Sequence, residues 1–128
     1  MVLIFGGAYQ GKLNYALERF GLSECNVFFC NEVDYDGSMP KGSKAVYEID
    51  KWILGLVKAD VDVAEKIEQL IKDNPDAIII CNDISCGVVP VDPVWRKWRE
   101  ETGRAIGKLA QYSDEVVRLF CGIPTRIK

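Results

Sequence analysis

The sequence of 128 residues contains no histidine. This absence excludes every mechanism that needs an imidazole as a base or a nucleophile. It also means that a structural zinc site would need four thiolates, and the sequence has no Cys-x-x-Cys pair. We therefore expect no metal-thiolate site and interpret the cysteines as free, buried thiols. The five are Cys25, Cys30, Cys81, Cys86 and Cys121.

Long apolar runs and an excess of basic charge are also lacking. No stretch approaches the roughly 20 apolar residues that span a bilayer, and no basic leader or cleavage-type segment precedes the first strand-like run. A net charge of -3 and a pI near 5.0 argue against a sequence-independent nucleic-acid binder, whose affinity comes from clustered Lys and Arg. We expect a cytoplasmic protein with small-molecule or protein partners. The length and the 48% hydrophobic content predict one domain, residues 1–128.

A glycine-rich segment lies between an apolar run at 2–5 and a helix-like run at 15–20. A strand, a glycine-rich turn and a helix start form a phosphate cradle, in which backbone N–H groups point inward and Lys12 reaches a terminal phosphate. Leu13 stands where a Ser or Thr hydroxyl should hold magnesium. The alternative is an ordinary strand-to-helix turn, in which the glycines are needed only for the tight backbone geometry and bind no phosphate. We predict that nucleotide phosphates bind Gly6-Gly7-Ala8-Tyr9-Gln10-Gly11-Lys12-Leu13-Asn14.

The rest of the chain alternates between strand-like and helix-like runs. Strands are predicted at 2–5, 26–30, 77–81 and 115–121, and helices at 14–20, 61–73 and 93–112. A strand, helix, strand succession favours parallel pairing with a right-handed crossover. The apolar run 77–81 is typical of a central parallel strand covered on both faces. It delivers Asn82 and Asp83 to the carboxyl edge of the sheet.

Two intervening segments are harder to interpret. If Ala45 to Ile49 is a strand, Asp50 lies at its carboxyl end, where open α/β sheets place their ligands. The alternative is one amphipathic helix from Val46 to Val57, and the sequence leaves both open. The long loop from Asn31 to Ser43 is predicted to be functional, with 34–42 as a lid or substrate-contacting segment.

The helix predicted over Pro93 to Tyr112 has an apolar and a charged set of side chains. We expect the charged set around Arg96 to form a solvated face. The apolar set is expected to pack into the core. Its members are Trp95, Trp98, Ile106, Leu109 and Ala110.

Several motifs in the second half resemble one known family. The run Cys81-Asn82-Asp83-Ile84-Ser85-Cys86-Gly87-Val88-Val89-Pro90 resembles the Asn-Glu-Val-Gly-x-Gly-Ile-Val-Pro signature of the adenosylcobinamide kinase and guanylyltransferase family. The helix start at 96–103 resembles that family's Arg-x-Phe-Arg-Asp-x-x-Gly motif, and 109–110, 114–116 and 122–128 follow in the family's order. The resemblance covers residues 1–20 and 77–128 well and the middle of the chain poorly.

The resemblance implies a fold, an activity and a set of site residues. The fold would be a three-layer α/β fold of the P-loop NTPase type with a mostly parallel central sheet, often assembled as a trimer. The family phosphorylates the aminopropanol hydroxyl of adenosylcobinamide with ATP or GTP in cobalamin biosynthesis, and then transfers GMP through a guanylylated histidine. By this resemblance the catalytic residues are Lys12, Asp50 and Asp83, of which Asp50 and Asp83 anchor Mg2+ directly or through water. The substrate would meet Asn82, Arg96 and Arg99.

Three departures limit what carries over from the family. The chain has no histidine, so the guanylylated intermediate cannot form. Leu13 removes one inner ligand of magnesium, although water or Asn14 could take its place. The family's acidic strand is reduced to the segment 48–52. We therefore predict a nucleotide-binding kinase without the guanylyl step. The alternatives are a non-catalytic nucleotide- or corrinoid-binding homologue that acts as a sensor or partner subunit, and a kinase for another small hydroxyl substrate.

Overall fold

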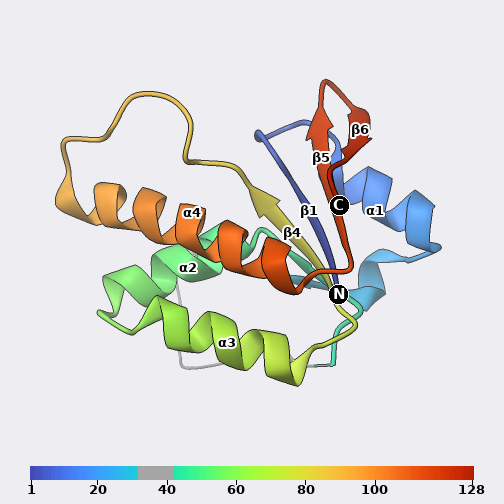
Figure 1. Cartoon of the computed structure of the whole chain (residues 1–128), viewed down its shortest axis with the longest axis horizontal. Helices are drawn as coiled ribbons and strands as arrows, with labels where there is room; N and C mark the ends of the chain where they lie inside the picture. Colours follow the sequence, from blue (N-terminus) through green and yellow to red (C-terminus); the bar gives the residue numbers. More distant parts are fainter. Residues whose placement is uncertain (32–41) are drawn as a thin grey trace.

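The computed structural model describes residues 1–31 and 42–128, and these form a sheet with helices on both faces (Figure 1). The strand order is β2-β3-β4-β1-β5-β6, and every neighbouring pair is parallel except β5 and β6. The elements are β1 (Val2–Gly6), α1 (Lys12–Phe20), the 3-10 turn η1 (Glu24–Asn26), β2 (Val27–Phe29), β3 (Ala45–Tyr47), α2 (Ile49–Lys58), α3 (Val63–Asp73), β4 (Ile78–Asn82), α4 (Pro93–Tyr112), β5 (Glu115–Phe120) and β6 (Ile123–Arg126).

Alternate residues of the central strands supply two cores, one on each face of the sheet. Leu3 and Ile79 pack with α2, α3 and α4 on one face. Ile4 and Ile80 pack with α1 on the other. Figure 1 shows the strands between α2, α3 and α4 on one side and α1 on the other. The predicted three-layer α/β fold with a mostly parallel sheet is confirmed.

The ambiguous segment contains both a strand and a helix. β3 ends at Tyr47, Glu48 turns the chain with a left-handed φ of 58°, and α2 begins at Ile49. The predicted strand to Ile49 is therefore too long, and the alternative helix from Val46 begins too early. The immediate turn places Asp50 in the first turn of α2, at the carboxyl end of β3.

The chain end adds a strand that the sequence did not predict. Cys121 and Gly122 both have positive φ and reverse the chain, so that β6 pairs antiparallel with β5. Pro124 lies in β6 opposite Leu119, and a proline is tolerated there because β6 is an edge strand. All four β6 residues are exposed, which explains why no apolar pattern in the sequence predicted this strand.

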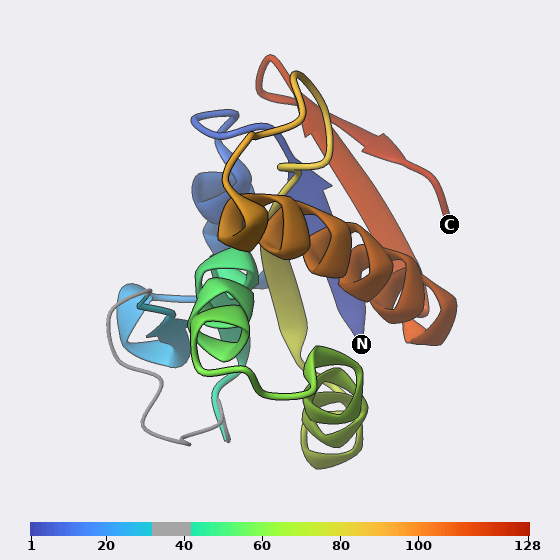
Figure 2. The ribbon, with the colours of Figure 1, turned by 90° about the vertical axis from the view of Figure 1, so that its left-hand side faces the viewer.

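The interpretation of Trp95 as a core residue is wrong. Its side chain is 42% exposed, whereas Leu109 is fully buried and Trp98, Ile106 and Ala110 pack partly against the core. The cause is the course of α4, which begins away from the strands and approaches them toward its C-terminal end (Figures 1 and 2).

The expectation of buried thiols holds for only two of the cysteines. All five are free, but Cys25, Cys86 and Cys121 are exposed. Cys25 lies in η1, Cys86 follows β4, and Cys121 lies in the β5–β6 turn, so none of these three belongs to a covered strand.

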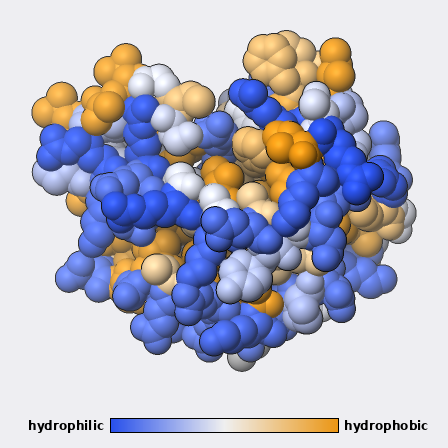
Figure 3. Space-filling view, viewed as in Figure 1, coloured by the Kyte–Doolittle hydropathy of each residue, from blue (hydrophilic) through white to orange (hydrophobic). Residues whose placement is uncertain are grey.

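Exposed apolar side chains concentrate on two segments near the carboxyl edge. Val88, Val89 and Val91 lie between β4 and α4, and Phe120 and Ile123 lie on the β5–β6 hairpin. Figure 3 shows hydrophobic residues on two projections at the top of the view, with a hollow between them. The first segment is a loop, and the second is the end of the edge hairpin of the sheet, where β6 is exposed throughout. Across the described parts of the chain, no helix is long and apolar enough to cross a membrane.

Candidate functional site

The glycine-rich segment leaves β1 at the carboxyl edge of the sheet and leads into α1. Gly6 has a φ of 153°, and a Cβ there would lie 2.3 Å from the backbone oxygen of Leu119 in β5. Gly11 has a left-handed φ of 83° directly before the helix. Both positions therefore require glycine for backbone reasons. Gly7 has no such requirement, because a Cβ there would make an ordinary 3.6 Å contact with Gln10.

Lys12 is buried within this loop. Its side chain is only 4% exposed, and its Nζ donates a hydrogen bond to the Gly7 carbonyl at 2.6 Å. Burial lowers the pKa of Lys12, and the nearby acidic groups Asp50 and Glu48 act in the opposite direction. The ammonium is thus held against the loop backbone, in a place where an anion would improve its environment.

The first turn of α1 is open to an anionic ligand. Among the described residues no side chain caps this helix start, and its first turn contains no acidic residue. By contrast, the starts of α3 and α4 are capped by Asp62 and Asp92. Uncapped N–H groups and the helix dipole together favour a phosphate at such a position.

Asp50 is bound by the last residue of β4. Its Oδ1 accepts from the Asn82 backbone N–H at 2.9 Å, and its Oδ2 accepts from the Asn82 side-chain amide at 3.1 Å. The side chain is 3% exposed, and burial raises the pKa of Asp50 although the hydrogen bonds from Asn82 lower it. Both carboxylate oxygens are therefore engaged within the protein.

Asp83 lies directly beside the loop and is partly exposed. Its backbone N–H donates to the Gly6 carbonyl at 2.9 Å. Its Oδ1 accepts from the Ser85 N–H at 3.1 Å and from the Ser85 hydroxyl at 2.5 Å, and its Oδ2 accepts a weaker contact from Cys86 Sγ at 3.7 Å. Of the two predicted metal ligands, Asp83 has the carboxylate that a metal ion could reach more easily.

A cleft of about 660 Å³ joins these groups. It brings most of the predicted phosphate loop together with Asp50, Asn82 and Asp83. It also includes five residues that were not predicted for the site. Of these, Lys51 and Trp98 reach the cleft because of how α2 and α4 pack. The lining consists of Ala8, Tyr9, Gln10, Gly11, Lys12, Leu13, Asn14, Tyr47, Glu48, Asp50, Lys51, Asn82, Asp83, Ile84 and Trp98.

The two predicted substrate-binding arginines do not line this cleft. Arg96 is exposed on α4. Arg99 donates from Nη2 to the Ser85 carbonyl at 2.5 Å, and so holds the segment that follows Asp83. The predicted lid lies almost entirely in residues 32–41, outside the described part of the chain.

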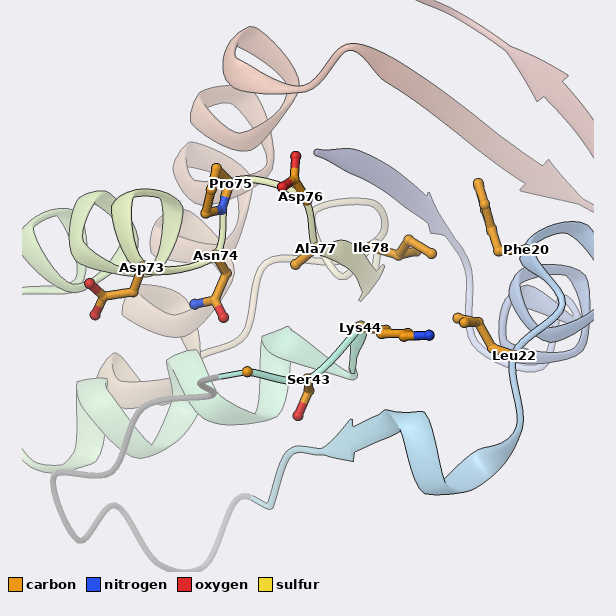
Figure 4. Close-up of a pocket in the computed structure, with 11 residues that line it drawn as sticks. Phe20, Leu22, Ser43, Lys44, Asp73, Asn74, Pro75, Asp76, Ala77 and Ile78 are labelled. Atoms are coloured by element: carbon orange, nitrogen blue, oxygen red, sulfur yellow. The ribbon is translucent and has the colours of Figure 1, made fainter.

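A second hollow, of about 420 Å³, lies at the opposite edge of the sheet (Figure 4). Phe20 and Leu22 line it on one side, and the chain from Asp73 to Ile78 lines it on the other. It contains none of the predicted site residues.

The cleft suits a nucleotide phosphate better than a magnesium ion. The uncapped helix start and the buried Lys12 are suited to an anion. For magnesium, the two residues that follow Lys12 offer a single polar side chain. Leu13 packs against the core on the α1 side of the sheet, and Asn14 is polar. Within residues 1–31 and 42–128, no group of three or more Cys, Asp or Glu residues is placed to hold a metal ion.

Comparison with known proteins assigns the chain to a family. No curated protein matches it. The sequence model of the family described as cobinamide kinase / cobinamide phosphate guanyltransferase matches residues 43–127, well over half of the chain. The match includes the middle of the chain, where the family resemblance was weakest, and it stops short of the phosphate loop. On this evidence the chain belongs to the cobinamide kinase / cobinamide phosphate guanyltransferase family.

Proposed function

We propose that this chain binds ATP or GTP in the loop 6–14 and transfers the terminal phosphoryl group to the aminopropanol hydroxyl of adenosylcobinamide. The burial of the Lys12 ammonium below an uncapped helix start carries this proposal. A buried charge is unfavourable unless a partner compensates it, and a triphosphate would be such a partner. Family membership, which assigns the chain to cobalamin biosynthesis, supports the acceptor.

In this proposal catalysis is a matter of positioning and charge. The amides from Gly7 to Lys12 hold the phosphates, and the Lys12 ammonium compensates the negative charge of the terminal phosphate. A bound magnesium ion would neutralise further phosphate charge, and Asp83, or Asp50 through water, would anchor it. Asn82, Arg96 and Arg99 stay candidates for contact with the acceptor.

The guanylyl half of the family activity is proposed to be absent. A histidine-linked intermediate needs an imidazole nucleophile, and the sequence contains none. The chain would then act as a kinase only, and the trimeric assembly implied by the family resemblance stays a prediction.

One observation favours a second candidate function, a non-catalytic nucleotide- or corrinoid-binding protein. Leu13 contributes to the core where a magnesium-binding hydroxyl is expected, and the Asp50 carboxylate is engaged by Asn82. A site weak in magnesium ligands could bind a nucleotide without turning it over.

Titration of ATP and GTP, with and without magnesium, tests both candidates. The variants are Lys12→Ala and, as a matched control, Lys58→Ala, which removes an exposed lysine at the far end of α2. We expect magnesium-dependent binding in the wild type and the control, and none in Lys12→Ala. Turnover of labelled ATP with adenosylcobinamide follows. If turnover does not exceed that of Lys12→Ala, the kinase proposal is wrong; binding without turnover would support the second candidate.

A further inference from the structure

Three residues form a hydrogen-bonded group beside the predicted phosphate loop, residues 6–14. Besides the two bonds between Asp50 and Asn82, the Trp98 Nε1–H donates to the backbone carbonyl of Asp50 at 2.7 Å. We call Asp50, Asn82 and Trp98 the brace. It connects α2, β4 and α4, and Figures 1 and 2 both show α2 and α4 side by side on one face of the sheet.

The brace reaches the phosphate loop through the next residue of the chain. Asn82 is the last residue of β4 and pairs with Gly6 in β1. Asp83 then donates its backbone N–H to the Gly6 carbonyl at 2.9 Å. The two bonds from Asn82 to the Asp50 carboxylate therefore connect α2 to the strand end that contacts the loop.

Stability alone gives a poor account of this arrangement. Asp50 is 3% exposed, and a buried carboxylate is often replaceable by packed apolar residues without loss of stability. A carboxylate offers two acceptors in fixed geometry, and here one orients the backbone and the other the side chain of the same residue. Such an arrangement fixes both the backbone and the side chain of Asn82 at the end of β4.

We propose that Asp50 is a positioning residue, whose carboxylate holds the end of β4 and thereby the phosphate loop in the geometry that binds nucleotide. Trp98 assists by fixing the backbone of Asp50. The effect on nucleotide affinity depends on the function proposed above, whereas the effect on the β4 end does not.

A swap of the two side chains tests the proposal. In Asp50→Ala, both acceptor oxygens are removed, so both hydrogen bonds from Asn82 are lost. In the double variant Asp50→Asn/Asn82→Asp, the new amide oxygen accepts the backbone N–H and the new amide nitrogen donates to the new carboxylate, so both bonds are retained. The matched control is Asp62→Ala, which removes a carboxylate that accepts a backbone N–H at the start of α3, away from the cleft.

We expect Asp50→Ala to weaken ATP binding roughly 10- to 100-fold, because small displacements of a binding loop have effects of that size. The double variant should recover most of the loss, and Asp62→Ala should leave ATP binding unchanged. Trp98→Phe, which keeps an aromatic ring and removes the donor, should weaken binding in the same direction but less. A loss that the double variant does not recover, or no loss in Asp50→Ala, would overturn the proposal.

Amide hydrogen exchange without nucleotide separates this proposal from the proposed function. Exchange at the backbone amide of residue 82 should quicken in Asp50→Ala, which lacks its acceptor, and slow again in the double variant. If exchange follows this order but the wild type binds no ATP, the brace is supported and the proposed function fails. If exchange at Asn82 is the same in all variants, the brace is wrong even where ATP binds.

Discussion

At the scale of single residues, Lys12 combines properties that oppose each other. Its ammonium is 4% exposed and donates to a neutral backbone carbonyl, so folding removes it from water, and the nearby Asp50 and Glu48 compensate for this only in part. Burial accordingly lowers its pKa. A residue that is unfavourable for stability and well placed for an anion is typical of a binding site.

Replacement of Lys12 by methionine should separate stability from function. Lys12→Met keeps an unbranched side chain and removes the charge, so we expect the free energy of unfolding at pH 7 to stay within about 1 kcal/mol of the wild type or to rise. ATP binding should be lost. Urea unfolding and calorimetric titration measure the two effects, and a destabilisation above about 3 kcal/mol would instead make Lys12 a structural residue.

The wild type and Lys12→Met should also differ in how their stability changes with pH. The folded-state pKa of Lys12 lies below its usual value of 10.5. At a pH between the folded-state pKa and 10.5, the unfolded chain therefore binds more protons than the folded chain does. The stability of the wild type relative to Lys12→Met should therefore rise with pH through that window and level off above it. A difference that stays flat across the alkaline range would contradict this expectation.

The cysteines should divide into two classes of reactivity. Burial, with Asp50 and Glu48, raises the pKa of Cys30 to about 12, and burial raises the pKa of Cys81 well above its usual value. Both thiols are therefore protonated and covered at pH 8, which makes them unreactive.

Alkylation with iodoacetamide at pH 8, followed by mass spectrometry, tests this division. We expect labelling of Cys25, Cys86 and Cys121 in the native protein and of all five cysteines in urea. Rapid native labelling of Cys81 would mean that the central strand β4 opens readily, contrary to its buried position.

At the scale of elements, the start of α4 depends on its own cap. The first turn of this helix lies away from the strands, and the Asp92 carboxylate accepts from the N–H groups of Val94 at 2.8 Å and Trp95 at 3.3 Å. Pro93 at the first helical position needs no N–H partner. Local interactions here replace the packing that stabilises the rest of the helix.

Removal of this cap should have a measurable cost. Asp92→Ala is expected to lower the free energy of unfolding by about 1 kcal/mol, because two N–H groups lose their acceptor. Asp92→Asn serves as the control, since asparagine caps a helix about as well as aspartate. Urea unfolding at pH 7 compares the three proteins, and equal losses in both variants would show that charge rather than capping matters.

At the scale of the whole molecule, the two cores share the same strands. Leu3 belongs to one core and Ile4 to the other, so β1 contributes to the packing of both. The sequence predicts a single domain, and this shared sheet supports that prediction without testing it.

A single domain should unfold in one cooperative transition. We expect tryptophan fluorescence and far-UV circular dichroism to give the same urea midpoint, because Trp52 in the core reports packing while dichroism reports helices. Midpoints that differ between the two probes would contradict the single-domain prediction.

Much of the fold could be predicted because the relevant signals are local. The helix expected over 93–112 has those bounds, and the strand expected at 77–81 is displaced by a single residue. The errors arise where contacts with other elements determine the burial or the pairing of a residue. Trp95 looks like a core residue, but the course of α4 exposes it, and β6 pairs with β5 without an apolar pattern of its own.

For the site, the sequence by itself determined a glycine-rich turn between β1 and α1 and the arrival of Asn82 and Asp83 at the carboxyl edge of the sheet, whereas it left the place of Asp50 open. The physical reason is that strand ends and glycine turns are set by residues adjacent in the chain. Only the tertiary structure decided that Asp50 binds Asn82, 32 residues away, and that Trp98 holds Asp50 from a third element. These bonds depend on how α2 and α4 pack against β4, and no periodicity within a single segment contains that information.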